Sequence, residues 1–205
     1  MLAEIARQLV SDPNTDPGFI QTAFGNKHVE VRKAVVNNAP LNDATAETFK
    51  SALKDSSYNI VETALLKLWA YYPFNKASLL DNIKNLDGQA MALKVRYLEL
   101  GTEAFPDMKE SMIASLAVLC GNQYEFRTRI NAMQALQRLN ACNKVVISNL
   151  FDAMLNFNSR LNAPAKDVLV YFKQQTQNLA LMKEVLRTGK YTDEERTKLS
   201  KALDI

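Results

Sequence analysis

The chain has 205 residues, with 25 lysines and arginines against 22 aspartates and glutamates, and 47% of its residues are hydrophobic. This composition is that of an ordinary folded protein, and it excludes a largely disordered chain, a collagen-like chain and a disulfide scaffold. The formal net charge of only +3 argues against a nucleic-acid partner, because duplex binding needs clustered cations. No apolar stretch reaches the roughly 20 residues that span a bilayer, so we expect no membrane partner. Nothing in the sequence indicates a compartment.

Glycines divide the chain into segments with helical spacing. Gly25, Gly101, Gly121 and Gly189 each follow an apolar run, at the place where a left-handed C-terminal cap favours glycine. Within the runs, apolar residues recur at i, i+3, i+4 and i+7, as in residues 61–68, and strand-like alternation is absent. These signals predict an all-α fold of about eleven short helices.

The last of these helices has the clearest start. Thr192 and Glu195 are spaced as a capping box, in which the hydroxyl and the carboxylate each accept a hydrogen bond from the other residue's backbone amide. We therefore expect a helix to begin directly after Thr192.

The chain also resembles itself at a fixed distance. Residues 18–36 correspond without a gap to residues 48–66, a shift of 30, so that Phe19 corresponds to Phe49. Each copy reads as helix, tight turn, helix, and the later copies are less regular. One such pair cannot bury its own apolar face, so successive pairs must stack. The pattern predicts an α-solenoid, or alpha-alpha superhelix, of about five to six antiparallel helix pairs, forming one domain over residues 1–205. A compact irregular helical bundle is the alternative.

Residues for chemistry are scarce. His28 is the one histidine and is expected in a solvent-facing turn, whereas zinc sites and Ser-His-Asp or Cys-His catalysis need several convergent groups. No glycine-rich phosphate loop is present. Cys120 and Cys142 fall in helical patterns and are interpreted as small buried hydrophobes, although a disulfide between them stays open. We expect no catalytic residue, no cofactor and no metal ligand in this chain.

Two aromatic residues are candidates for an interaction site. Trp69 and Tyr72 end a predicted helix just before Pro73 and could form a peptide-binding hot spot. The alternative is that Trp69 belongs to the core, since it follows Leu68 on the same apolar face.

Four basic residues form a second candidate site. Lys94, Arg96, Arg127 and Arg129 could line a groove for an acidic partner or a carboxylate. The alternative is that they are solvated helix faces.

The stretch DSSYNIVETAL at residues 55–65, followed by Tyr72 and Pro73, resembles the HEAT-like helical domain that ends zinc aminopeptidases of the aminopeptidase N class, especially bacterial ones. This resemblance implies a HEAT/armadillo-like domain at the C-terminal end of a larger metallopeptidase. It implies that the domain packs against an upstream catalytic domain, which holds the zinc, and shapes access for peptide substrates. No catalytic residue carries over, because the metal motif and the substrate-amine motif of that family are absent here.

Residues 12–17 together with residues 31–35 also resemble bacterial HEAT-type repeats in general. Two other functions therefore stay open. One is a free-standing HEAT-repeat scaffold that binds a protein or peptide partner. The other is a DNA glycosylase built from HEAT-like repeats, which the low net charge disfavours.

Overall fold

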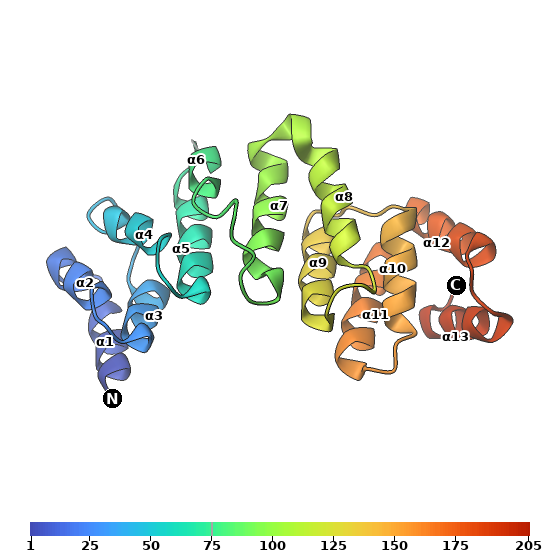
Figure 1. The fold of residues 1–205 in the computed structure, drawn as a ribbon, viewed down its shortest axis with the longest axis horizontal. Helices are drawn as coiled ribbons and strands as arrows, with labels where there is room; N and C mark the ends of the chain where they lie inside the picture. Colours follow the sequence, from blue (N-terminus) through green and yellow to red (C-terminus); the bar gives the residue numbers. More distant parts are fainter. Residues whose placement is uncertain (75) are drawn as a thin grey trace. The chain divides into compact units, whose positions relative to one another are not determined.

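The computed structural model describes residues 1–74 and 76–205, and in these residues it contains helices and turns but no strand. The helices are α1 (Leu2–Val10), α2 (Pro17–Phe24), α3 (Val29–Asn38), α4 (Ala46–Ala52), α5 (Tyr58–Tyr71), α6 (Lys76–Leu80), α7 (Ala92–Ala104), α8 (Lys109–Leu119), α9 (Phe126–Arg138), α10 (Lys144–Met154), α11 (Ser159–Lys173), α12 (Thr176–Thr188) and α13 (Asp193–Leu203) (Figure 1). Two short 3₁₀ helices, Gln89–Met91 and Pro106–Met108, flank α7. The all-α prediction is confirmed, with more helices than the eleven expected. Within the described residues, no helix has both the length and the apolar character needed to cross a membrane.

The chain packs as two compact units, which we call unit 1 (Met1–Gln89) and unit 2 (Ala90–Ile205). The prediction of one domain over the whole chain stays a prediction.

In unit 1, helices contact both their sequence neighbours and the helix after next. α2 packs on α3 and α4 packs on α5, while α1, α3 and α5 contact one another in series and α2 contacts α4. The buried faces follow the helical spacing in the sequence, since Val61, Ala64, Leu65 and Leu68 of α5 are all buried. Short apolar helices that cannot hide a whole face alone thus share one core.

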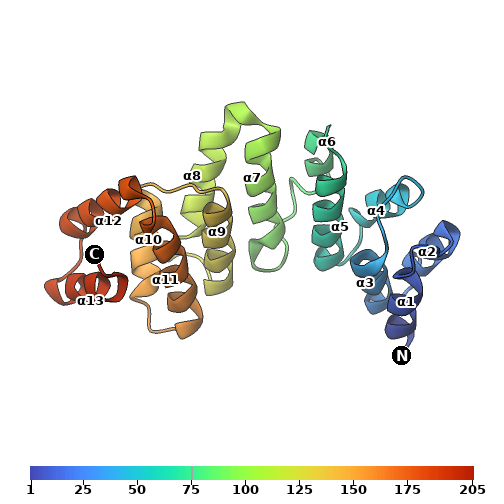
Figure 2. The same cartoon turned by 180° about the vertical axis from the view of Figure 1, so that it is seen from behind.

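Unit 2 repeats this pattern over more helices. α7, α9, α11 and α13 contact one another in series, as do α8, α10 and α12, and most sequence neighbours also touch. Figures 1 and 2 show α9 and α11 side by side from both directions. One continuous apolar core runs from Val95 in α7 to Leu203 in α13 and includes the fully buried Phe151 and Phe172.

The repeat period in unit 1 is 29 residues, so the predicted shift of 30 is wrong by one. α2 and α4 begin 29 residues apart, at Pro17 and Ala46, and α3 and α5 are offset by the same number. This step matches Ile20 with Phe49, both 1% exposed, whereas the shift of 30 matches Phe49 with Phe19, which is 40% exposed. Because Phe19 and Ile20 are adjacent and both apolar, a shift of 29 and a shift of 30 each match an apolar residue to Phe49. Only the burial of the side chains distinguishes the two shifts.

The glycines do not act as the left-handed caps that we expected. Gly25 and Gly189 are C-caps, but neither has positive φ, and Gly88 is the described glycine that does. Gly101 lies inside α7, where a Cβ atom would be 2.6 Å from Sδ of Met112 in α8. Gly101 therefore lies where α7 and α8 approach closely rather than in a turn, and a larger residue there would require the end of the Met112 side chain to move.

The capping box at the start of α13 is confirmed. The Glu195 amide donates to Oγ1 of Thr192 at 3.2 Å, and the Thr192 amide donates to Oε2 of Glu195 at 2.8 Å. These two bonds satisfy backbone donors that the first turn of a helix otherwise leaves free.

Candidate functional site

The two aromatic candidates lie in unit 1 at the end of α5. Trp69 is buried, which confirms its assignment to the core, and Nζ of Lys76 lies 5.0 Å from its ring centroid. Tyr72 is the half-buried C-cap of α5, and Nζ of Lys50 lies 5.5 Å from its ring centroid. Both rings thus face a cation of their own unit. Their role as a peptide-binding hot spot stays a prediction.

The four basic candidates lie in unit 2, and three of them lie beside side chains of their own helices: Lys94 beside Tyr97 and Arg96 beside Glu99 in α7, and Arg127 beside Phe126 in α9. The fourth, Arg129 of α9, differs because its side chain is buried, with only 4% of the residue exposed. The alternative reading of these residues as solvated helix faces therefore fails for Arg129.

The direction of the Arg129 side chain follows from its place in the helix. The fourth residue is an arginine in three helices: Arg32 in α3, Arg129 in α9 and Arg196 in α13. Side chains at the start of a helix lean back toward the preceding turn. Nη1 of Arg32 donates to the carbonyl oxygens of Asn26 and Lys27 at 3.0 and 3.2 Å. Arg196 likewise donates to four carbonyl oxygens, two in its turn and two at the end of α12. Nε of Arg129 donates to the carbonyl oxygen of Cys120 at 2.9 Å. The guanidinium, with five donors, thus holds the turn against its helix.

Arg32 has a second partner, in the turn before the next helix pair. Its Nε donates to Oδ2 of Asp55 at 2.7 Å, and its Nη2 donates to Oδ1 at 3.0 Å. Oδ1 of Asp55 also accepts the amide of Ser57 at 2.8 Å. Burial by itself would raise the pKa of Asp55, but the hydrogen bonds from Arg32 and Ser57 outweigh it and hold that pKa below its usual value.

In unit 2 an asparagine stands where Asp55 stands in unit 1. Oδ1 of Asn156 accepts the amide of Asn158, the N-cap of α11, at 2.9 Å, just as Asp55 accepts the amide of Ser57, the N-cap of α5. The turn is therefore the same, but an uncharged amide replaces the carboxylate. Nη2 of Arg129 is buried and has no hydrogen-bond partner. Such a group is costly unless something else satisfies it.

Arg129 lines an open cavity of about 530 Å³ within unit 2, which we call the Arg129 cavity. Its lining residues come from the turns before α9, α11 and α13 and from the helices beside them: Asn122, Arg129, Asp152, Leu155, Asn156, Phe157, Lys190, Tyr191 and Glu195.

The charged groups of the Arg129 cavity differ in how they are engaged. Nζ of Lys190 lies 3.5 Å from Oδ2 of Asp152, and Glu195 is held by the capping box of α13. Burial lowers the pKa of Arg129, and the charges of Cys120 and Asp152 oppose that shift. Arginine keeps its positive charge even when it is buried, so the Arg129 cavity offers a buried cation with an N–H donor that has no partner.

The sequence held a signal for Arg129 that grouping residues by charge did not reveal. Arg32, Arg129 and Arg196 each follow the N-cap of their helix by four residues. Asp55 and Asn156 each precede the next N-cap by two residues. The combination of the two spacings predicts which arginine meets a carboxylate and which does not.

The chemical groups weighed for catalysis are not brought together. His28 is exposed as the N-cap of α3, which confirms its place in a turn. Across residues 1–74 and 76–205, no three His, Cys, Asp or Glu side chains are grouped so that they could hold a metal ion. The two cysteines are free thiols, Cys120 buried and Cys142 half-buried.

Comparisons with known proteins add no family. No protein-family model matches the sequence, and no curated protein matches it.

Proposed function

We propose that the chain is a non-catalytic, HEAT-like α-solenoid that packs against the catalytic domain of a zinc aminopeptidase and shapes access for its peptide substrates. Zinc and the catalytic residues belong, in this proposal, to the upstream domain. The proposal combines the resemblance of residues 55–65 to the C-terminal domain of such enzymes with two features of the packing.

The first feature is the series of contacts between alternate helices. Such contacts run through α1, α3 and α5 in unit 1 and through α7, α9, α11 and α13 in unit 2. Stacked helix pairs produce this pattern, because each pair contacts mainly its neighbours along the array. It supports a solenoid over a closed bundle within each unit.

The observation that carries the proposed function is an exposed apolar face on α1. Ala6 and Val10 of this helix are buried, whereas Leu2, Ile5 and Leu9 are exposed at helical spacing. The first helix of a solenoid needs a polar outer face if solvent covers it. An apolar face in that position is typical of a surface that another part of the protein covers.

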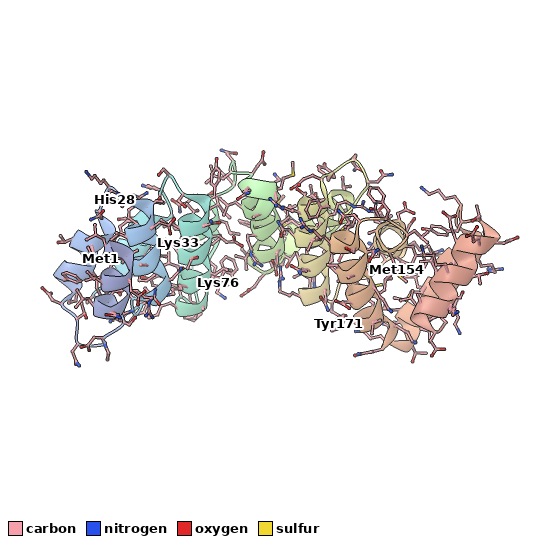
Figure 3. The ribbon with its side chains drawn as sticks, turned by 90° about the horizontal axis from the view of Figure 1, so that it is seen from below. Met1, His28, Lys33, Lys76, Met154 and Tyr171 are labelled. Carbon is pink, nitrogen blue, oxygen red and sulfur yellow. The ribbon has the colours of Figure 1, made fainter. Side chains whose placement is uncertain are left out.

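A shallow cavity lies beside the same face. It measures about 360 Å³ and is lined by Met1, Leu2 and Ala3 and by residues 28–31 from the start of α3. Met1 and His28 are both labelled in Figure 3. The cavity extends the apolar surface of α1 and gives a covering domain a place to insert a side chain.

The gene upstream of Met1 provides the first test. We expect the reading frame to continue into a domain with a zinc-binding motif. A stop codon and a promoter directly before Met1 would contradict the proposal and favour a free-standing protein-interaction scaffold.

The second test is reconstitution from two separately expressed parts. We expect the upstream domain to co-purify with this chain, and Ile5→Glu combined with Leu9→Glu to abolish co-purification, because charges would be buried against an apolar partner. Val145→Glu is the matched control, since Val145 is exposed near the start of α10 and tolerates an acid there. Equal recovery of the two variants would refute the role of the α1 face.

A further inference from the structure

We propose that the Arg129 cavity binds a carboxylate that is attached to an apolar group, with the carboxylate accepting a hydrogen bond from Nη2 of Arg129, whose Nε is engaged by the Cys120 carbonyl. The site lies wholly within unit 2 and does not depend on what precedes Met1.

The comparison between the two units identifies the missing group. Arg32 has its turn carbonyls and also a carboxylate, which accepts two hydrogen bonds from the guanidinium. Arg129 has the carbonyl oxygen of Cys120, but Asn156 replaces the carboxylate and Nη2 is left without a partner. A planar carboxylate matches the two parallel donors of a guanidinium better than any other common anion except phosphate.

The charges around the cavity favour a carboxylate over a phosphate. Asp152 and Glu195 also line it, so the two cations Arg129 and Lys190 are already balanced. A singly charged ligand adds less repulsion from these carboxylates than a doubly charged one. The buried Arg129 supplies direct hydrogen bonds, whereas Lys190 is engaged with Asp152 at 3.5 Å.

The rim of the cavity favours an apolar group next to the carboxylate. Phe157 is 97% exposed, and it lines the cavity together with Leu155. An aromatic ring in water beside a polar cavity is a contact surface for an apolar side chain. A peptide carries a carboxylate and an apolar group together, either at its C-terminus or where an acidic residue has an apolar neighbour.

Four small probes test the ligand class by NMR titration of the full chain. N-acetylleucine carries the carboxylate of a peptide C-terminus, and the α-methylamide of N-acetylglutamate carries that of an acidic side chain. We expect at least one of them to bind saturably, and the tighter one identifies the source. N-acetylleucinamide should bind at least about tenfold more weakly, because it lacks the charge and the ionic hydrogen bond is lost. Inorganic phosphate should also bind at least about tenfold more weakly, because its second negative charge adds repulsion from the carboxylates of the cavity.

A variant that fills the site from within gives the sharpest test. Asn156→Asp places a carboxylate where Asp55 stands in unit 1, so it should occupy Arg129, weaken binding of the carboxylate probe at least about tenfold and raise the melting temperature. Asn26→Asp is the matched control. It makes the same change in a turn of the same kind before α3 of unit 1, where Oδ1 of Asn26 accepts the amide of His28 at 2.9 Å. This control should bind the probe as the unchanged chain does.

Phe157→Ala tests the apolar part without risk to the core. It should weaken N-acetylleucine and leave acetate unaffected. The proposal is overturned if no carboxylate probe binds, if N-acetylleucine and its amide bind equally, if phosphate binds as tightly as the carboxylates, or if Asn156→Asp binds like Asn26→Asp.

Discussion

Arg32 and Asp55 join two successive helix pairs of unit 1 through a two-point ion pair, Nε to Oδ2 at 2.7 Å and Nη2 to Oδ1 at 3.0 Å. The Asp55 side chain is 4% exposed and that of Arg32 is 15% exposed. Asp55→Asn leaves Arg32 buried without its anion, and we expect a loss of about 3 kcal/mol in the free energy of unfolding. Urea denaturation followed by the fluorescence of Trp69, the one tryptophan of the chain and part of unit 1, measures this loss.

The control for that measurement is Glu47→Gln. Glu47 pairs with Lys50 at 2.7 Å on the surface of the same unit, with 83% of its side chain exposed. Exposed pairs add little to stability, so the urea midpoint should not move. A midpoint that moves equally in both variants would show that the buried pair has no special role.

A pH dependence is expected from Glu99 in unit 2. Arg138 and Arg96 both donate to this buried carboxylate. Burial alone would raise the pKa of Glu99, but the two guanidinium groups outweigh burial and lower it. Because the unfolded chain then takes up this proton more readily than the folded chain, the stabilisation is complete above about pH 5 and is lost as the pH falls through the folded pKa.

Glu99→Gln removes the pH-dependent stabilisation that the ionised Glu99 carboxylate provides. The variant should be less stable than the unchanged chain by about 2 to 3 kcal/mol near neutral pH, and the gap should narrow steadily as the solution is acidified. Thermal unfolding followed by circular dichroism across that pH range measures the gap. A gap independent of pH would mean that Glu99 acts through packing alone.

The repeat period can be tested by truncation of three side chains. With a period of 29, Ile20 and Phe49 are equivalent core residues and Phe19 is not. Phe49→Ala and Ile20→Ala should each cost about 3 kcal/mol, whereas Phe19→Ala should cost less than about 1 kcal/mol. Equal losses at Phe19 and Phe49 would restore the period of 30. Trp69 fluorescence in urea again reports on the unit concerned.

The repeat period of unit 1 shows how far the sequence specifies the fold. Helical spacing identified which residues of α5 are buried, because a 3.6-residue period leaves only one face for the core. The period between repeats was missed by one because both Phe19 and Ile20 are apolar. Hydrophobicity alone gives two registers there, and the choice depends on which neighbour the packing of α2 buries.

The candidate site was predicted only in part, for a similar reason. Arg129 was one of four basic residues selected by charge, and charge says nothing about burial. Its position four residues after the N-cap of α9, shared with the half-buried Arg32 and Arg196, directs its side chain toward the preceding turn. Asn156, which stands where unit 1 has a carboxylate, lies 27 residues further along the chain, and only the comparison of its spacing with that of Asp55 relates it to Arg129.

Thiol reactivity gives a last check on unit 2. Burial raises the pKa of Cys120 to about 12 and that of Cys142 to about 11. The thiolate is the reactive form, so at about pH 8 both thiols should react with an aromatic disulfide reagent far more slowly than in the unfolded chain. Cys142 should react first because it is half-buried, whereas Cys120 is fully buried at the end of α8 and its carbonyl oxygen holds Arg129. In Cys142→Ser, labelling of the remaining thiol should therefore track global unfolding in urea, and rapid labelling of that variant without denaturant would show that the turn before α9 opens on its own.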